Sequence, residues 1–390
     1  FKLDPNAVFS DGSKITPEDV KGTWEMGSMP LSASQRVPLV LAGVVGYDDI
    51  VNGSSTELTG VKIVDEATIE VSLKAADPIF YMRLANHLVP ITKVSQSRGA
   101  DGNQNPDWYM PDMGVVSSGP FKLVEWTPNN RSVLERFDKF FLDCRPYLDK
   151  VIFAMSADAT SATLGVERGD AQMMPFSSRS ANLNRLAGNK KVAVLSKGYE
   201  GFGGVTWLAF NLTRKPYSDI AVRKAIAHAL DRNFIAKALQ GGYAEPLEGP
   251  LHPSSPFATK DLVHYPLDLK KATQLLDGAG YKAGADGERF KIVMDYFPGA
   301  DEWSKNGAEY ARSQLKKIGI TVQIRPEPDF LTWAKRMGEH DFDVPIDGVF
   351  NWGDPVIGVH RTYLSSNIKP IVWYNTQSYK NQKVNQLLEQ

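Results

Sequence analysis

A chain of 390 residues is longer than one hydrophobic core normally supports, so we expect at least two lobes. Its 44 basic and 45 acidic residues give a net charge of -1, which excludes the electrostatic footprint of a nucleic-acid-binding protein or of a protein held on an anionic membrane. The single cysteine, Cys144, excludes an intrachain disulfide and a cysteine-based metal cluster, and we expect a partly buried thiol without a chemical role.

The first half of the chain predicts short helices and strands. Thr16 is a good helix cap, Pro17 suits the first helical position, and Asp19 stands at the capping-box position. Residues 27–60 are rich in Gly, Ser and Pro and indicate a small, irregular subdomain. The pattern predicts a helix from 17 to about 26, a β-hairpin over 61–74, a helix over 78–88, strands over 121–124, 132–135 and 151–153, a helix over 160–168 and a strand over 192–195.

The segment from Trp207 to Leu239 predicts a strand followed by helices. Its first apolar run ends at Asn211, which is typical of a short buried strand. Asp219 is a good N-cap for a helix whose apolar residues recur at helical spacing, and Asp231 marks a break before a second short helix. On its own pattern the segment is structural, because it contains no catalytic arrangement.

After residue 211, strands and helices alternate, which is typical of an α/β lobe with a largely parallel sheet. The pattern predicts helices over 268–277, 301–318 and 329–337, and strands over 290–297, 320–324 and 342–350. We therefore predict the lobe boundary near residue 208. Residues 1–208 form the first lobe with its small subdomain, and residues 209–390 form the second lobe.

Motifs of catalysis and cofactor binding are absent from the sequence. It contains no G-x-S-x-G, H-E-x-x-H or P-loop motif, and no G-x-G-x-x-G between a strand and a helix. The six histidines are scattered, and no pair has the spacing of metal ligands on a helix. No apolar run approaches the roughly 18 residues that a membrane span needs. We expect no catalytic residue, no metal and no cofactor.

A candidate binding site follows the last predicted strand. Ligand sites on open α/β sheets lie beyond the carboxyl ends of the strands, and Phe350 and Asn351 stand at such an end. Trp352 can stack on a ligand, and Asp354 is either a ligand contact or a turn residue before a proline. By the same rule Tyr296 and Phe297 face the site, and we add Phe202 from the glycine-rich approach to residue 208. For His360 and Arg361, a surface or loop-anchoring role is favoured over contact with ligand.

Six motifs, in order, carry a resemblance to a known family. The run from Asn211 to Arg232 resembles the signature of extracytoplasmic solute-binding proteins of the peptide/nickel class, family 5, which serve ABC importers. The other landmarks are Phe9-Ser10-Asp11-Gly12 with Ile15 to Val20, Ser118 to Phe121, Leu164 to Asp170, Lys271 to Tyr281 and Tyr379 to Leu388. They span nearly the whole chain.

The resemblance implies the fold and the role of the protein. It implies an α/β, two-lobed periplasmic-binding-protein fold of the type II-like cluster C, with an extra small subdomain in the first lobe. Further strands are expected before Phe1, and a segment returning to the first lobe after Gln390. A receptor of this family is a periplasmic or lipid-anchored monomer that closes on a solute by hinge bending and delivers it to the ABC permease. It binds no nucleic acid and is not an enzyme.

The ligand class is less closely defined by the resemblance. The family's dipeptide-binding pattern uses an aspartate near the loop after the last strand and an arginine after an earlier strand. This chain has Asn351 and Trp352 at the first place and Tyr296 and Phe297 at the second. We therefore expect peptide-like solutes longer than dipeptides, held through their backbone. The alternatives are an oligosaccharide or an opine or sugar conjugate, then a nickel chelate, and outside this role a hydrolase or a ligand-sensing regulatory domain.

Overall fold

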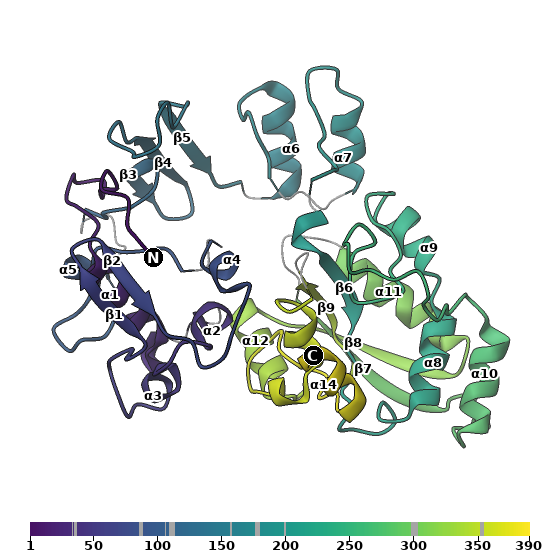
Figure 1. Cartoon of the computed structure of the whole chain (residues 1–390). Coiled ribbons are helices and arrows are strands. Elements are labelled where there is room, and N and C mark those ends of the chain that lie inside the picture. The colour runs from purple at the N-terminus through teal and green to yellow at the C-terminus, as the bar shows by residue number, and fades with distance from the viewer. Residues whose placement is uncertain are drawn as a thin grey trace. The chain divides into compact units, whose positions relative to one another are not determined.

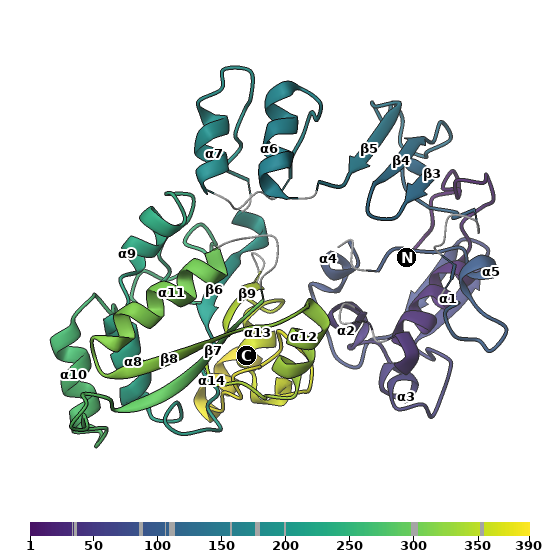
Figure 2. The same cartoon turned by 180° about the vertical axis from the view of Figure 1, so that it is seen from behind.

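The computed structural model describes residues 1–32, 34, 37–85, 89–105, 107–108, 114–156, 158–175, 180–198, 200–297, 303–351 and 355–390. By its contacts the chain divides into two units, residues 1–156 and 157–390 (Figures 1 and 2). This division differs from the predicted lobe boundary near residue 208, because it groups residues 157–208 with the second unit. The boundary between functional lobes stays a prediction.

The first unit begins with helices packed on a hairpin. Its elements are α1 (Pro17–Ser28), η1 (Pro30–Ser32), α2 (Val37–Leu41), α3 (Tyr47–Val51), β1 (Val61–Asp65), β2 (Thr68–Val71), α4 (Phe80–Leu84) and α5 (Val94–Ser97). The capping box predicted at the start of α1 is present, since Thr16 and Asp19 each accept a hydrogen bond from the other's backbone N–H. Val20 and Trp24 of α1 pack into the core of this unit.

A three-stranded antiparallel sheet completes the first unit. Its strands are β3 (Phe121–Thr127), β4 (Arg131–Arg136) and β5 (Lys150–Ala154), in that order. The strand β5 lies at one edge and exposes its apolar side chains Ile152 and Phe153. Cys144, in the loop before β5, is exposed, so the prediction of a partly buried thiol is wrong. Asp143, Arg145 and Pro146 surround it, and residues of these types favour a surface loop.

The second unit contains the α/β lobe predicted from the alternation of elements. Its elements are α6 (Ala159–Arg168), α7 (Ser180–Ala187), η3 (Glu200–Phe202), β6 (Gly204–Leu208), α8 (Ile220–Ala229), α9 (Arg232–Phe234), η4 (Ile235–Leu239), α10 (Leu269–Gly278), β7 (Phe290–Tyr296), α11 (Trp303–Lys316), β8 (Ile320–Pro326), α12 (Phe330–Gly338), β9 (Ile346–Phe350), α13 (Val359–Tyr363), η5 (Ser365–Asn367) and α14 (Gln382–Glu389).

The sheet of the second unit is mixed, with the strand order β6-β9-β7-β8. β7 is parallel to both β8 and β9, whereas β6 runs antiparallel to β9. The predicted strand over 342–350 begins only at Ile346. The predicted strand over 192–195 is wrong, because the N–H of Val192 closes a turn onto Asn189 and Leu195 is exposed.

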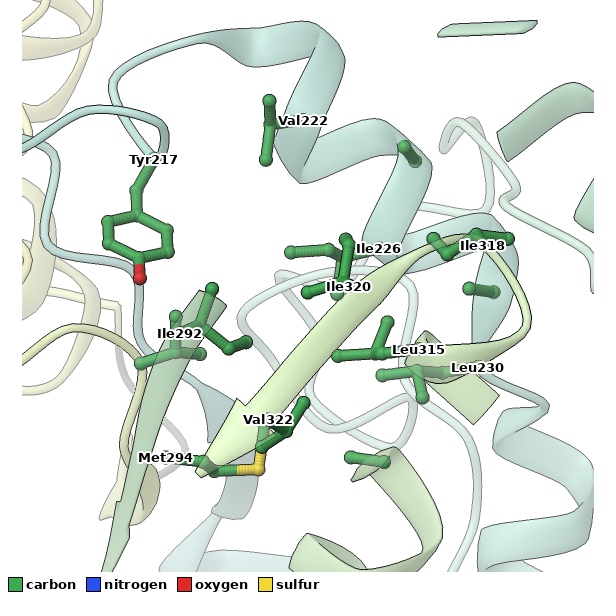
Figure 3. Packing of buried hydrophobic residues seen from close by; sticks show 14 of the residues in the cluster. Tyr217, Val222, Ile226, Leu230, Ile292, Met294, Leu315, Ile318, Ile320 and Val322 are labelled. Carbon is green, nitrogen blue, oxygen red and sulfur yellow. The ribbon is translucent and has the colours of Figure 1, made fainter. Parts of the chain in front are cut away.

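One hydrophobic core holds this sheet against its helices. Val222 and Ile226 of α8 point toward Ile292 of β7 and Ile320 of β8, and Leu315 of α11 packs beside them (Figure 3). These side chains are almost fully buried, and each contributes about 1.5–3 kcal/mol through burial alone. This core fixes the positions of the strand ends where a site was predicted. None of the helices that the structure describes is long and apolar enough to span a membrane.

Candidate functional site

The carboxyl ends of the parallel strands lie at one edge of the sheet in the second unit. Tyr296, the last residue of β7, is in register with Pro326 at the end of β8 and with Ile346 at the start of β9. The strand β9 therefore continues beyond the end of β7 and presents Phe350 past the edge of its neighbour. This is the place where ligands bind open α/β sheets.

Two phenylalanine rings meet at the end of β9. The ring centroids of Phe202 and Phe350 lie 6.4 Å apart with an interplanar angle of 63°, an edge-to-face pair. The register between β6 and β9 brings them together, because Gly204 pairs with Phe350. Phe350 is 52% exposed and Phe202 is 40% exposed. The pair thus exposes apolar ring surface to solvent, which both residues need if they are to contact a ligand as predicted.

The backbone that carries Phe350 is held from several directions. Arg361 of α13 donates from Nη2 to the carbonyl oxygen of Phe350 at 2.8 Å. The N–H of Asn351 donates to the carbonyl of Gly203 at 3.0 Å, and its Nδ2 donates to the carbonyl of Pro250 at 2.6 Å. This hydrogen bond is in keeping with an anchoring role, one of the two roles favoured for Arg361 from the sequence. Asn351 is fully buried in this conformation, so its side chain contacts protein, and a contact with ligand stays a prediction.

Tyr296 and Phe297 differ in how they meet the edge. Tyr296 is 7% exposed and belongs to the hydrophobic core between the sheet and its helices. Phe297 is half-buried and packs edge-to-face on Phe330 of α12, with ring centroids 5.9 Å apart. Of the two, Phe297 is therefore placed closer to the surface of the edge. The predicted site residues Trp352 and Asp354 lie outside the described residues.

A second aromatic group, which sequence reasoning missed, lies beside Phe297. Phe330 and Trp333 of α12 have ring centroids 5.6 Å and 6.1 Å from Trp373. The spacing of Phe330 and Trp333, three residues apart on a predicted helix, is a signal that could have found part of this group. Nothing in the local sequence points to Trp373, which joins from the C-terminal segment. Trp333 is 3% exposed, and Phe297 and Trp373 pack against the hydrophobic core cluster to which Trp333 belongs.

Asp347 is a buried carboxylate on β9 beneath this edge. It accepts hydrogen bonds at Oδ1 from the N–H of Gly348 at 2.6 Å and from Nε1 of Trp373 at 3.3 Å, and it is in register with Trp207 of β6. Burial raises the pKa of its carboxyl to about 6, although these donors and the charge of Arg361 oppose the rise. Sequence reasoning did not single out Asp347.

Two further buried carboxylates near the ends of β7 and β8 pair with arginines. Asp295 forms an ion pair with Arg325, its register partner on β8. Glu327 lies 2.9 Å from Nε of Arg336 in α12. Burial raises the pKa of Asp295, and the hydrogen bond and charge of Arg325 oppose that rise. These four charged groups are thus engaged with one another inside the unit.

The described part of the chain contains no group of three or more His, Cys, Asp or Glu side chains that could hold a metal ion. The exposed ring pair of Phe202 and Phe350 is therefore what the edge offers. Exposed ring surface of this kind suits an apolar or ring-bearing solute.

Comparison with known proteins identifies the family to which the chain belongs. Residues 1–370 match the family of bacterial extracellular solute-binding proteins, family 5 middle. Heme-binding protein A of Haemophilus influenzae is 25% identical over 375 residues, in an alignment that covers 94% of this chain and 62% of that protein. The chain thus spans less than two thirds of this relative's length.

Two solved structures show the same fold. A periplasmic oligopeptide-binding protein of Borrelia burgdorferi has a TM-score of 0.81 at 22% identity, covering 100% of this chain and 74% of its own. AppA of Bacillus subtilis, solved in complex with a nonapeptide, has a TM-score of 0.76 at 25% identity, with the same coverage of 100% and 74%. The predicted fold class, a two-lobed α/β periplasmic-binding-protein fold, is confirmed.

Proposed function

We propose that this chain, which belongs to family 5 of the bacterial extracellular solute-binding proteins, is the receptor of an ABC importer and binds a peptide-like solute. The members of this family are binding proteins, and the six motifs in the sequence predicted that the chain belongs to it. The observation that carries the proposal is the match of residues 1–370 to the family. The nonapeptide bound to the related AppA supports a peptide as the ligand class.

The working cycle that we propose has no chemical step. The receptor captures its solute by hinge closure and hands it unchanged to a permease in the membrane. A closed, ligand-bound form that differs from the open form gives the permease a means to select loaded receptors. We propose a periplasmic or lipid-anchored monomer, in keeping with the extracellular role of the family.

For the ligand we propose a peptide longer than a dipeptide, held by its backbone and by apolar side chains. The exposed ring pair of Phe202 and Phe350 suits an apolar side chain, and Phe297 adds to the aromatic surface. The buried carboxylate Asp295 is engaged by Arg325, so that pair does not supply a free charge to a ligand terminus. Trp352 and Asp354 belong to the proposed site on sequence grounds.

A ligand screen tests this proposal directly. Native mass spectrometry of the protein as purified identifies any solute that it retains. A thermal-shift panel then compares peptides of two to nine residues with oligosaccharides of similar size. A ligand at a hundred times its dissociation constant adds about 2.7 kcal/mol to the free energy of unfolding, which is readily detected.

Each outcome of the screen has a distinct meaning. Stabilisation by peptides of four or more residues, recovered intact after incubation, supports the proposal. Stabilisation by oligosaccharides alone would replace the peptide with a sugar while keeping the receptor role. Cleavage of a peptide with turnover would contradict the receptor role and favour a hydrolase.

A further inference from the structure

We propose that His252 binds the peptide ligand, and that its Nε2–H donates a hydrogen bond to a main-chain carbonyl oxygen of the solute. This inference rests on the proposed function and deepens it, because it assigns a residue to the recognition of the ligand backbone. His252 lies in the loop between η4 and α10. Neither the sequence motifs nor the rule for strand ends pointed to this residue.

The loop that carries His252 lies against the end of β9. The carbonyl oxygen of Pro250 accepts a hydrogen bond from Nδ2 of Asn351 at 2.6 Å, and Asn351 directly follows Phe350. Two residues of fully extended chain span at most about 7 Å, so the Cα atoms of His252 and Pro250 lie within that distance. His252 is therefore near the edge of the sheet where the ligand site was predicted.

The base of the same loop is anchored by an ion pair. Nη2 of Arg232, in α9, lies 3.0 Å from the carboxylate of Glu248 and donates to the carbonyl oxygen of Tyr265 at 3.0 Å. Glu248 stands two residues before Pro250, so the loop is fixed to the rest of the unit at both positions. A group that is already ordered loses less entropy when it binds a ligand.

The turn after Pro250 fixes the imidazole and its proton. The N–H of Ser255 donates to the carbonyl oxygen of His252 at 2.9 Å, which closes a β-turn with Pro253 at its second position. Nδ1 of His252 accepts a hydrogen bond from the N–H of Ser254 at 3.2 Å, and Oγ of Ser254 lies 2.7 Å from the same nitrogen. Because a backbone N–H can only donate, Nδ1 carries no proton, and the neutral ring holds its proton on Nε2.

The imidazole of His252 thus presents a donor whose direction is set by the turn. The residue is half-buried, and the two ring contacts with Ser254 both involve Nδ1, on the other side of the ring from Nε2. An extended peptide carries a carbonyl oxygen on every residue, and these oxygens are acceptors for such a donor. One hydrogen bond between neutral groups contributes roughly a three- to tenfold gain in affinity.

Three replacements of His252 separate ligand binding from support of the turn. In His252→Gln the side-chain amide N–H lies near the position of Nε2, so the donor is retained. In His252→Asn the amide oxygen lies near the position of Nδ1, so the acceptor for Ser254 is retained and the donor is lost. His252→Leu retains neither. His264→Leu is the control, because His264 belongs to the same loop and its side chain, which pairs with Glu248, is 68% exposed.

Isothermal titration of the full 390-residue chain measures the dissociation constants of penta-alanine and of its C-terminal amide. Should penta-alanine bind too weakly, the tightest peptide of the ligand screen takes its place, again as acid and amide. We expect His252→Leu and His252→Asn to weaken the binding of both forms roughly three- to tenfold. We expect His252→Gln and the control to change it less than about twofold, because both retain the donor.

Other results would overturn the inference. If His252→Asn keeps the wild-type affinity while His252→Gln loses it, His252 only supports the turn; this comparison decides even if His252→Leu fails to fold. Equal affinities for all variants, or a loss confined to the peptide with a free carboxylate, would show that no main-chain carbonyl is bound. Each of these results leaves the receptor role in place. A wild type that binds no peptide of the ligand screen overturns the proposed function and this inference together.

Discussion

Replacing Asp347 by asparagine is expected to stabilise the protein at neutral pH. Burial raises the pKa of its carboxyl from 3.8 to about 6, so the folded protein holds this proton more tightly than the unfolded chain does. The stability that the proton contributes is fully present below about pH 4 and is lost as the pH rises through about 6. A pKa difference of this size corresponds to about 3 kcal/mol, which the ionised carboxylate forfeits at pH 7.

Urea unfolding between about pH 4 and pH 8 measures this effect. Asparagine keeps the shape of the side chain and an oxygen that accepts from Gly348 and Trp373. We expect the variant to match the wild type near pH 4 and to exceed its free energy of unfolding by up to about 3 kcal/mol at pH 7, with an unchanged m-value. Asp261→Asn, at an exposed loop position, makes the same charge change without burial. A difference between Asp347→Asn and wild type that stays flat across this pH range would refute the reasoning.

Three further substitutions test the packing and capping described above, each by its effect on the free energy of unfolding in urea. Gly358→Ala places a Cβ 2.2 Å from the carbonyl oxygen of Asn351 and should lower the free energy of unfolding by about 1–3 kcal/mol or more. Gly348→Ala is the control, because its Cβ meets only the carbonyl oxygen of Val205 at 3.8 Å and should cost clearly less. Equal losses for the two variants would contradict the tight contact at Gly358. Thr16→Ala removes the cap of α1 and should cost about 1 kcal/mol, and no loss would mean that the cap is redundant. Leu315→Ala empties part of the core and should cost about 2–5 kcal/mol; a loss below 1 kcal/mol would show that the site collapses.

Local chemistry made most of the fold predictable. Helix starts were identified because their capping side chains act within three residues of themselves, as Thr16 and Asp219 do in the structure. The strands of the parallel ladder were identified because apolar residues recur along them. The strand predicted over 192–195 rested on the same kind of signal and is wrong, because an apolar run of four residues forms a strand only if another strand lies beside it.

The candidate site was predictable only where it follows from strand ends. Phe350 was singled out because it ends a strand, where the rule for open sheets places ligands, and its contact with ligand stays a prediction. The contact between Phe350 and Phe202 depends on pairing between β6 and β9, which no local pattern encodes. The burial of Asn351 likewise depends on Pro250, a residue far away in the chain. Asp347 escaped notice because an isolated aspartate in a strand looks like a surface residue.

The segments that carry the two rings, η3 with β6 and the end of β9, come from distant parts of the chain. Gly204 pairs with Phe350, whereas the parallel ladder of β7 and β8 pairs Phe290 with Ile320. The pairing of β6 with β9 closes a longer loop than the pairing of β7 with β8, and the longer loop costs about 1.4 kcal/mol more in chain entropy. At about 5–20 residues per second, a ribosome needs on the order of ten seconds to synthesise the chain from β6 to β9. During that time β6 lacks its described partner strand β9, so the ring pair is among the last contacts of this unit to form.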